Sequence, residues 1–282
     1  MCLILFSWQS HPKYPLVVLA NRDEFYERKT HVMHWWDDHP EVLAGRDLAD
    51  VKGQAGTWMG MTSKGKFSAL TNIRAPSEKN PELRTRGELP HHYLTSPLNP
   101  TDFVSTYGKS FNRYNGFNLL MTDLSQANPE LYWVSNRVAM GDDIRPRKII
   151  NPHKLSPGSY GLSNAMLDTP WPKVQHRIAA FSHVLGMDTG DFKKPESYLQ
   201  IMQDSSTAED AKLPSTGVSY EWEKALSAAF IQTEHYGTRA TSLLRVTHDG
   251  SFECIERTYD AKKEVGTVVF EGQIENFASL KS

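Results

Sequence analysis

The sequence predicts an α+β protein built as a four-layer αββα sandwich, with two β-sheets inside and helices outside. Strand-like patterns come first, helical patterns follow, and strand-like patterns return near the end of the chain. Most of the strand-like runs are apolar on both faces, so each sheet must be covered on both sides. No internal repeat, linker or low-complexity tract interrupts the 282 residues, which favours a single domain over residues 1–282.

The chain begins with two short apolar runs, residues 3–8 and 16–20, separated by a turn-rich segment. This pattern is typical of a β-hairpin. If the turn lies midway between the runs, the antiparallel register places Cys2 opposite Arg22 and beside Asp23. The hairpin therefore predicts a thiol, a guanidinium and a carboxylate at one end of a sheet.

The chain after the hairpin shows further patterns that predict a loop, strands and helices. Residues 27–50 show no period and are expected to form a long ordered loop. Strands are predicted at 67–71, 117–122, 131–135, 158–164, 236–246, 251–257 and 267–270. Amphipathic helices are predicted at 86–94, 102–114, 171–185, 196–202 and 223–231. Thr101 is the expected N-cap of the second of these helices.

Composition narrows the classes of partner. The net charge is −2, and no basic excess indicates binding to nucleic acid. No apolar run approaches the roughly 20 residues of a transmembrane helix, so no integral membrane span is expected. Cys2 and Cys254 are too few and too far apart for a disulfide framework. We therefore expect a cytoplasmic protein in a reducing compartment.

Cys2 has the chemistry of an N-terminal nucleophile if Met1 is removed. The residue would then carry a thiol and a free α-amine, which titrates at about 7.7–8.0 and can act as a general base. Arg22 would favour the thiolate, and Asp23 would orient the ammonium. The alternative is an ordinary buried strand cysteine followed by a solvated turn, because free cysteines are often simply buried.

Several segments, in order along almost the whole chain, resemble the NRDE family, whose animal members are called transport and Golgi organisation 2 (TANGO2) proteins. The resemblance rests first on Cys2 with Asn21-Arg22-Asp23-Glu24, and on Leu70-Thr71-Asn72-Ile73-Arg74. The other matching segments are Gly45-Arg46-Asp47, Gly56-Thr57-Trp58-Met59-Gly60, Tyr114-Asn115-Gly116-Phe117-Asn118-Leu119-Leu120, Gly161-Leu162-Ser163-Asn164, Asp168-Thr169-Pro170-Trp171-Pro172-Lys173-Val174 and Tyr236-Gly237-Thr238-Arg239.

The resemblance implies a fold of the N-terminal-nucleophile (Ntn) hydrolase type, similar to that of N-terminal Cys hydrolases that act on linear amides. If the chain is an enzyme, it then acts on non-peptide C–N bonds. The residues carried over by position are Cys2 as nucleophile, Arg22 as thiolate stabiliser, Asp23 as amine orienter, Asn72 and Asn164 as oxyanion donors, and Arg239 as a second cation. Losing one oxyanion donor costs about 10²–10³ in rate.

The same resemblance also implies a different function, the binding and trafficking of haem or of a lipid-like or acyl ligand. This is the first expectation, and amide hydrolysis is the alternative. The candidate haem ligands are Cys2, His34 and His235, with His91 and His92 as further histidines. No Cys-x-x-Cys-His segment exists, so haem would be bound non-covalently. A protein acceptor for the ligand is a further expected partner.

Overall fold

The computed structural model describes residues 2–48, 56–140, 143–147, 149–261, 263–275 and 277. They form two compact units, each assembled from separate segments of the chain. The first unit combines the chain up to Glu27 with Pro157–Gly272, and the second combines Arg28–Ser156 with the chain from Gln273 onward. Each unit contains a sheet and helices, so the predicted α+β class is confirmed. The single-domain organisation stays a prediction.

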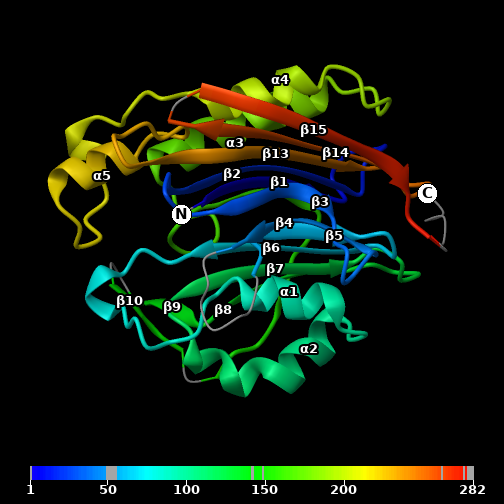
Figure 1. Ribbon diagram of the computed structural model, residues 1–282, viewed down its shortest axis with the longest axis horizontal. Helices are drawn as coiled ribbons and strands as arrows, with labels where there is room; N and C mark the ends of the chain where they lie inside the picture. The colour runs from blue at the N-terminus through cyan, green and yellow to red at the C-terminus, as the bar shows by residue number, and fades with distance from the viewer. Residues whose placement is uncertain are drawn as a thin grey trace. The chain divides into compact units, whose positions relative to one another are not determined.

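The first unit is built on a six-stranded sheet (Figure 1). Its strands are β1 (Cys2–Trp8), β2 (Leu16–Phe25), β12 (Gly158–Leu162), β13 (Tyr236–Val246), β14 (Ser251–Asp260) and β15 (Lys263–Gln273). Their order across the sheet is β12-β1-β2-β13-β14-β15. The N-terminal hairpin therefore lies inside the sheet, with β12 on one side and β13 on the other.

The hairpin has the register that the sequence predicts. Cys2 pairs with Arg22 across β1 and β2, and the antiparallel pairing continues to Trp8 opposite Leu16. On the other side of β2, Arg22 pairs with Ala240 of β13. The end of β2 is thus held between two strands that lie far apart in the sequence.

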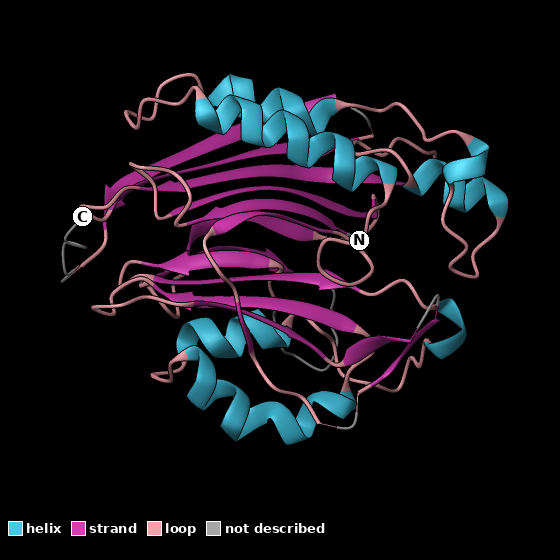
Figure 2. Ribbon diagram, turned by 180° about the vertical axis from the view of Figure 1, so that it is seen from behind, coloured by secondary structure: helices cyan, strands magenta, loops and turns pink. Residues whose placement is uncertain are grey.

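Helices cover one face of this sheet, as Figure 2 shows. They are α3 (Pro172–Gly186) and α4 (Pro195–Leu199), while α5 (Tyr220–Leu226) lies beyond the ends of the strands (Figure 1), and short 3₁₀ turns lie at Gln200–Gln203 and Asp210–Lys212. Leu3 and Leu5 of β1 and Leu19 of β2 pack in one core with Val174 and Phe181 of α3. Because neighbouring strand residues point to opposite faces, these odd-numbered positions of β1 and β2 mark the helix-covered face.

A buried charge cluster fastens the segment after α3 to the sheet. The Arg245 side chain of β13 is fully buried between the rings of Phe192 and Tyr198. Its guanidinium lies 3.0 Å from Asp188 and 2.6 Å from Glu253, the residue opposite it on β14. A buried cation is tolerated only with partners of this kind. Removing one partner would leave the remaining charges buried and uncompensated.

The second unit contains a seven-stranded sheet, ordered β11-β8-β7-β6-β5-β4-β3. Its strands are β3 (Thr30–Trp35), β4 (Val42–Asp47), β5 (Met59–Thr62), β6 (Lys66–Asn72), β7 (Phe117–Asp123), β8 (Leu131–Ser135) and β11 (His153–Lys154), and β9 (Arg137–Met140) pairs with β10 (Asp143–Pro146). Its helices are α1 (Glu88–Thr95) and α2 (Pro100–Tyr107), with 3₁₀ turns at Pro76–Glu78 and Gly108–Arg113. Among the described residues, no helix is both long and apolar enough to span a membrane.

Two sequence predictions in this unit are wrong. The predicted loop at 27–50 contains β3 and β4, which are stabilised by pairing with each other and with β5. β3 is the outermost strand and only Met33 in it is buried, so it lacks the apolar alternation that marks a half-buried strand. The predicted N-cap of α2, Thr101, lies inside the helix; the Asn99 side chain accepts from the Asp102 N–H instead.

The buried cluster around Arg245 yields a stability prediction. Arg245→Ala leaves Asp188 and Glu253 without their shared cation, so we expect the free energy of unfolding to fall by about 3–5 kcal/mol. Urea denaturation measures this change. Arg257→Ala is the matched control, because its ion pair with Glu196 is partly exposed and should cost at most about 1 kcal/mol. Equal losses for the two variants would contradict the prediction.

Candidate functional site

Cys2 lies at the start of β1 and is 8% exposed. Its strand partner Arg22 is also buried. The backbone N–H of Asp23 donates a hydrogen bond to the Cys2 sulfur. Burial raises the pKa of the Cys2 thiol, and the positive charge of Arg22 acts in the opposite direction. The thiol therefore depends on its charged neighbours, or on a base, to ionise near neutral pH.

The Asp23 carboxylate is almost completely buried. It accepts a 2.7 Å hydrogen bond from the Thr238 hydroxyl, and Thr238 is its strand partner on β13. Burial raises the pKa of Asp23, while Lys173, Thr238 and Arg22 each favour the charged form. A carboxylate in this position is held in one orientation at the end of β2.

The side chains at the end of β2 divide between the two faces of the sheet. Arg22 shares its face with Cys2, because directly paired residues point the same way. Asp23 points to the helix-covered face together with Asn21. The Asn21 amide donates to the backbone carbonyls of Met202 and Ala229, which ties this part of β2 to the helical layer.

Asn164 lies near Cys2, just beyond the end of β12. The Ser163 hydroxyl is 3.3 Å from the Cys2 carbonyl oxygen and 3.4 Å from the Asn164 side-chain oxygen. Ser163 and Asn164 are both buried. Because β12 pairs with β1 in antiparallel register, Asn164, a predicted oxyanion donor just beyond β12, lies at the end of the sheet where Cys2 lies.

Arg239 and Asn72, the other two residues carried over from the family, are placed differently. Arg239 lies where the register of β13 against β2 shifts, and its guanidinium donates to the backbone carbonyls of Phe25 and Tyr26, each at 2.9 Å. These bonds fix the end of β2. Asn72 ends β6 in the second unit, where it pairs with Phe117 of β7.

The structure adds Lys173, which lies in a segment that resembles the family but is not among the predicted site residues. Lys173 is buried in the first turn of α3, and its ammonium donates a 2.9 Å hydrogen bond to the Leu226 carbonyl. The signal in the sequence was a lysine directly after Trp171-Pro172, at the start of the predicted helix at 171–185. Thr238 and Ser163 also lie in segments that resemble the family, but no role in the site was predicted for either.

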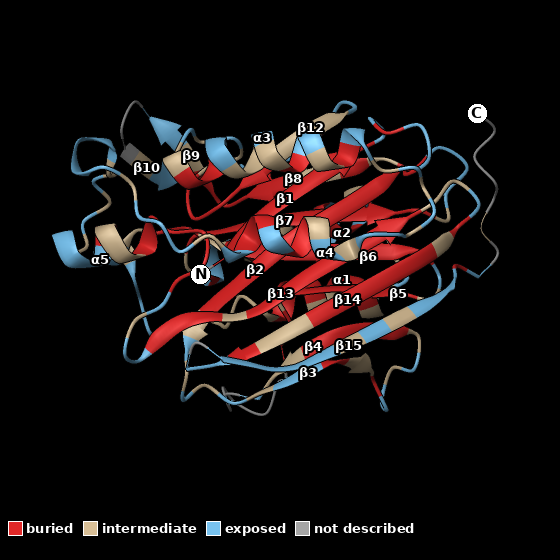
Figure 3. Ribbon diagram, turned by 90° about the horizontal axis from the view of Figure 1, so that it is seen from above, coloured by how far each residue is buried: buried red, intermediate tan, exposed pale blue. Residues whose placement is uncertain are grey.

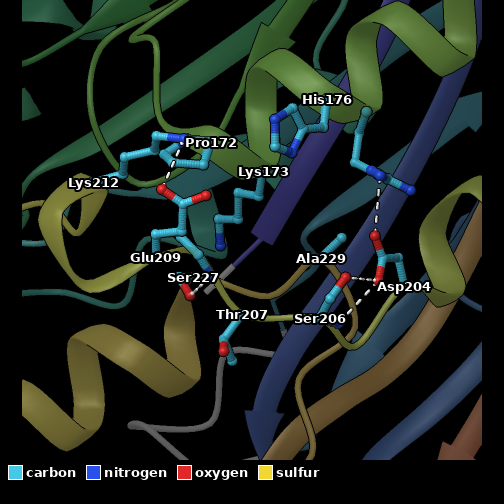
Figure 4. Close-up of a pocket in the computed structure, with 12 residues that line it drawn as sticks. Pro172, Lys173, His176, Asp204, Ser206, Thr207, Glu209, Lys212, Ser227 and Ala229 are labelled. Atoms are coloured by element: carbon cyan, nitrogen blue, oxygen red, sulfur yellow. Dashed lines mark hydrogen bonds and ion pairs between the residues drawn. The ribbon is translucent and has the colours of Figure 1, made fainter.

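Lys173 lines a cavity of about 160 Å³ between α3 and the loop before α5 (Figure 4). Arg177 pairs with Asp204 at 3.0 Å, and Lys212 pairs with Glu209 at 3.0 Å, so two pairs of its charged groups are mutually neutralised. The cavity is polar and smaller than the roughly 300–1,000 Å³ of typical ligand pockets. It does not fit a large apolar ligand such as haem.

The predicted haem ligands are not gathered in either unit. His235 is 79% exposed in its side chain and lies 3.5 Å from Glu234. Cys2, in the same unit, is buried. His34 lies on β3 in the second unit, where its Nδ1 donates to the Val32 carbonyl at 2.8 Å.

An aromatic patch lies next to the charged end of β2. Phe25 and Trp222 both pack edge-on against Tyr236, with ring centroids 5.1 and 5.5 Å apart from it. Phe25 is 45% exposed and Trp222 is 38% exposed. Phe25 follows Asp23 by two residues, which is one repeat of a β-strand. An apolar surface therefore begins one repeat beyond Asp23.

The second unit holds a group of histidines around α1. The His91 ring lies 5.3 Å from the Trp36 ring, 6.0 Å from His39 and 5.7 Å from His92, measured between centroids. Within the described part of the chain, His91 Nδ1 is buried with no hydrogen-bond partner. No group of three or more metal-ligating side chains in those residues is placed to hold a metal ion. Burial, aided by His92 and His39, lowers the pKa of His91 to about 4.

Comparison with known proteins shows the family to which the chain belongs. The sequence profile described as Transport and Golgi organisation 2 (TANGO2) matches residues 1–261. The chain therefore belongs to the transport and Golgi organisation 2 family. It is 32% identical to the Transport and Golgi organization 2 homolog of Mus musculus and 31% identical to the Homo sapiens homolog, covering 92% of this chain and 93% of each relative.

Solved structures show weaker likeness. A C2A mutant of the conjugated bile acid hydrolase from Clostridium perfringens aligns over 100% of this chain and 99% of its own, with a TM-score of 0.48 and 9% identity. The Caenorhabditis elegans ortholog of N-acylethanolamine-hydrolyzing acid amidase aligns over 71% of this chain and 85% of its own, with a TM-score of 0.43 and 10% identity.

The lowered pKa of His91 predicts a pH-dependent stability. The folded-state value of about 4 lies below the unfolded value of roughly 6.5, so protonation favours the unfolded chain. The contribution is present above about pH 6.5 and is lost as the pH falls through about 4. Allowing for partial exposure of the ring, we expect a loss of about 1–2 kcal/mol over this window. Urea denaturation at several pH values measures it.

His91→Gln removes the titrating group and should flatten that part of the stability profile. His183→Gln is the matched control, because His183 is exposed on α3 and should leave the slope unchanged. A slope that is the same for His91→Gln and the parent protein would show that other groups cause the pH dependence.

Proposed function

We propose that the chain is an N-terminal cysteine amidohydrolase that acts on a non-peptide C–N bond after removal of Met1. The observation that carries the proposal is the pairing of Cys2 with Arg22, next to the buried Asp23. A thiol, a guanidinium and a carboxylate close together at the start of β1 and the end of β2 support a role for Cys2 as an N-terminal nucleophile.

The proposed reaction has two stages. The α-amine of Cys2 takes the thiol proton, and the sulfur attacks the amide carbonyl carbon, whose oxygen becomes an oxyanion. The C–N bond then breaks, the leaving nitrogen receives the proton, and a thioester forms on Cys2. Water, deprotonated by the same amine, attacks the thioester, releasing the carboxylic acid and restoring the thiol. No oxidant, reductant or metal is needed for this balance.

In this proposal, each residue around Cys2 has a separate role. Arg22 stabilises the thiolate, and Asp23 holds the α-ammonium that forms when the amine takes a proton. Asn164 is positioned to donate to the oxyanion, a role predicted to contribute about 10²–10³ in rate. Arg239 acts indirectly by fixing the end of β2 through Phe25 and its neighbour. Asn72 remains a predicted second donor.

The aromatic patch lies on the face of β2 that carries Asp23, opposite the face of Cys2 and Arg22, so it offers apolar surface only to a part of the ligand that reaches the Asp23 side. Phe25 and Trp222 expose ring surface on Tyr236, close in sequence to the charged residues of β2. Covering such rings with an apolar group removes their surface from water and is favourable by about 25 cal/mol per Å². The proposal also includes a cytoplasmic location, because a free catalytic thiol persists in a reducing compartment.

An acylation experiment tests the proposal. Protein whose Met1 has been removed, as verified by intact mass, is incubated with a p-nitrophenyl ester and with a panel of N-acyl amides. We expect the mass of one acyl group to appear on Cys2, with release of the amine or phenol. Cys2→Ala should abolish the adduct because no nucleophile remains.

Cys254→Ala is the matched control. Cys254 is the other free cysteine, and burial raises the pKa of its thiol, so acylation should be unaffected by its loss. An adduct that persists in Cys2→Ala, or the absence of any adduct on processed protein, would overturn the amidohydrolase proposal.

The second candidate function is the binding and trafficking of haem or of a lipid-like ligand. The aromatic patch supports it, because exposed Phe25 and Trp222 offer apolar surface and His235 precedes Tyr236 directly. The buried Cys2 thiol, whose pKa is raised, is a poor source of a thiolate ligand in the unprocessed chain. His235 is therefore the better candidate for a weak axial ligand to a haem that is cargo rather than a resident cofactor.

Hemin titration tests this candidate. Saturable binding should produce a Soret band that shifts in His235→Ala and weakens in Trp222→Ala. His183→Ala serves as control, since it removes an exposed histidine elsewhere in the same unit. Unsaturable binding, or identical spectra for all these variants, would rule out the proposed haem site.

A further inference from the structure

A β-bulge in β13 decides which residue lies opposite Asp23. Over most of its length β13 keeps one register against β2, and that register ends with Ala240 opposite Arg22. Continued by one residue, it would bring Arg239 opposite Asp23. The register instead shifts between Thr238 and Ala240, so that Thr238 pairs with Asp23. The bulge therefore gives the buried carboxylate a hydroxyl as its strand neighbour in place of a guanidinium.

The Thr238 hydroxyl is fixed by the backbone of the segment after α5. The Ile231 carbonyl accepts from the Thr238 N–H at 2.9 Å, and the Ile231 N–H donates to the Thr238 hydroxyl oxygen at 2.9 Å. Gly237 permits this close approach, because an added Cβ would lie 2.6 Å from the Ile231 carbonyl oxygen. Thr238 and Ile231 are both buried, so water does not compete for these bonds.

These contacts determine where the single proton of the Thr238 hydroxyl points. The oxygen accepts from Ile231, and the proton is donated to Asp23 Oδ1 at 2.7 Å. Within the part of the chain that the structure describes, this hydroxyl has no other hydrogen-bond partner. A proton on Asp23 Oδ1 would place two protons between the same pair of oxygens, and one hydrogen bond would be lost. The contact therefore favours the ionised carboxylate.

We propose that Thr238 is a positioning residue, which keeps the Asp23 carboxylate ionised and in one orientation for the α-amine of Cys2. It acts through Asp23 and does not touch the substrate. The inference rests on the proposed function for its catalytic meaning, whereas the link between Thr238 and Asp23 is testable without it. Burial raises the pKa of Asp23, and the hydrogen bond from Thr238 acts in the opposite direction, which supports the assignment.

Charged and titratable groups also surround Asp23 on the neighbouring elements. They are Cys2 on β1, Arg22 and Glu24 on β2, Tyr26 after β2, Lys173 at the start of α3 and Arg239 on β13. A substitution that removes only the hydroxyl of Thr238 leaves all of these groups in place. A change in the titration of Asp23 in such a variant is then assigned to the hydroxyl.

Side-chain carboxyl NMR of Asp23 in full-length protein without Met1 provides the first test. Thr238→Val keeps the branched shape of the side chain but removes the hydroxyl. We expect the pKa of Asp23 to rise by about one unit, because one hydrogen bond to the charged form is lost. Thr238→Ser keeps the hydroxyl and should stay close to the parent value. The acid limb of the pH profile for Cys2 acylation should move to higher pH by the same amount in Thr238→Val only.

Thr241→Val is the matched control. Thr241 is also buried on β13, and its hydroxyl donates at 2.6 Å to the side-chain oxygen of Asn21, two residues before Asp23 on the same face of β2. Its removal costs a comparable buried hydrogen bond but takes no partner from a titrating group, so Asp23 should titrate as in the parent protein. An equal shift in Thr241→Val and Thr238→Val would overturn the inference.

A measurement on the unsubstituted protein covers the case in which Thr238→Val does not fold. Because the Ile231 N–H donates to the hydroxyl that donates to Asp23, the amide proton shift of Ile231 should follow the titration of Asp23. The amide proton of Thr233, which is donated to the Tyr236 carbonyl, should not follow it. An Ile231 shift that stays constant while Asp23 titrates would contradict the inference.

The two proposals fail in different ways. If Asp23 titrates identically in Thr238→Val and the parent protein, the inference is wrong even when Cys2 is acylated, and any loss of stability in that variant makes Thr238 purely structural. If Asp23 responds to Thr238→Val but the parent protein is never acylated, the positioning of Asp23 is correct and the amidohydrolase proposal is wrong. A Thr238→Ser variant that shifts as far as Thr238→Val would show that the hydroxyl does not control Asp23, which also overturns the inference.

Discussion

Two opposite charges, Arg22 and Asp23, are buried side by side at the end of β2, and the arrangement of the first unit follows from the need to accommodate them. Each is expensive to remove from water unless it has partners. Because consecutive strand residues point to opposite faces, the two charges need different neighbours. Cys2 of β1 lies on one face, while Thr238 of β13 and the start of α3 serve the other.

Part of the arrangement around Arg22 and Asp23 could be predicted from the sequence, because it depends on local patterns alone. The hairpin register follows from two apolar runs and one turn, so the placement of Cys2 opposite Arg22 needed no tertiary information. Thr238 could not be selected in the same way, since it contacts Asp23 only through the pairing of β2 with the distant strand β13. β3 was missed because an exposed outer strand has no apolar period, and its stability comes from pairing with β4. Asn72 was grouped with Cys2 by the family resemblance alone; it ends β6 in the other unit, and its role as an oxyanion donor stays a prediction.

The burial of Cys2 bears on both proposed functions. A thiol whose pKa is raised by burial is neither a ready nucleophile nor a ready haem ligand, so a base must be supplied next to it. A free α-amine on the same residue supplies one without any rearrangement of the fold. β15, by contrast, is exposed along most of its length at the edge of the sheet, as Figure 3 shows.

The pairing of β2 with β13 has a consequence for how the protein is made. Arg22 meets its partner Ala240 only after more than two hundred further residues have left the ribosome, because the second unit is encoded between them. Contacts of such long sequence separation form late and slow folding. The hairpin that bears Cys2 therefore lacks its β13 partner through most of synthesis. A chain truncated anywhere before β13 would carry the Cys2 thiol but would lack Thr238, whose hydroxyl donates to the buried Asp23 carboxylate.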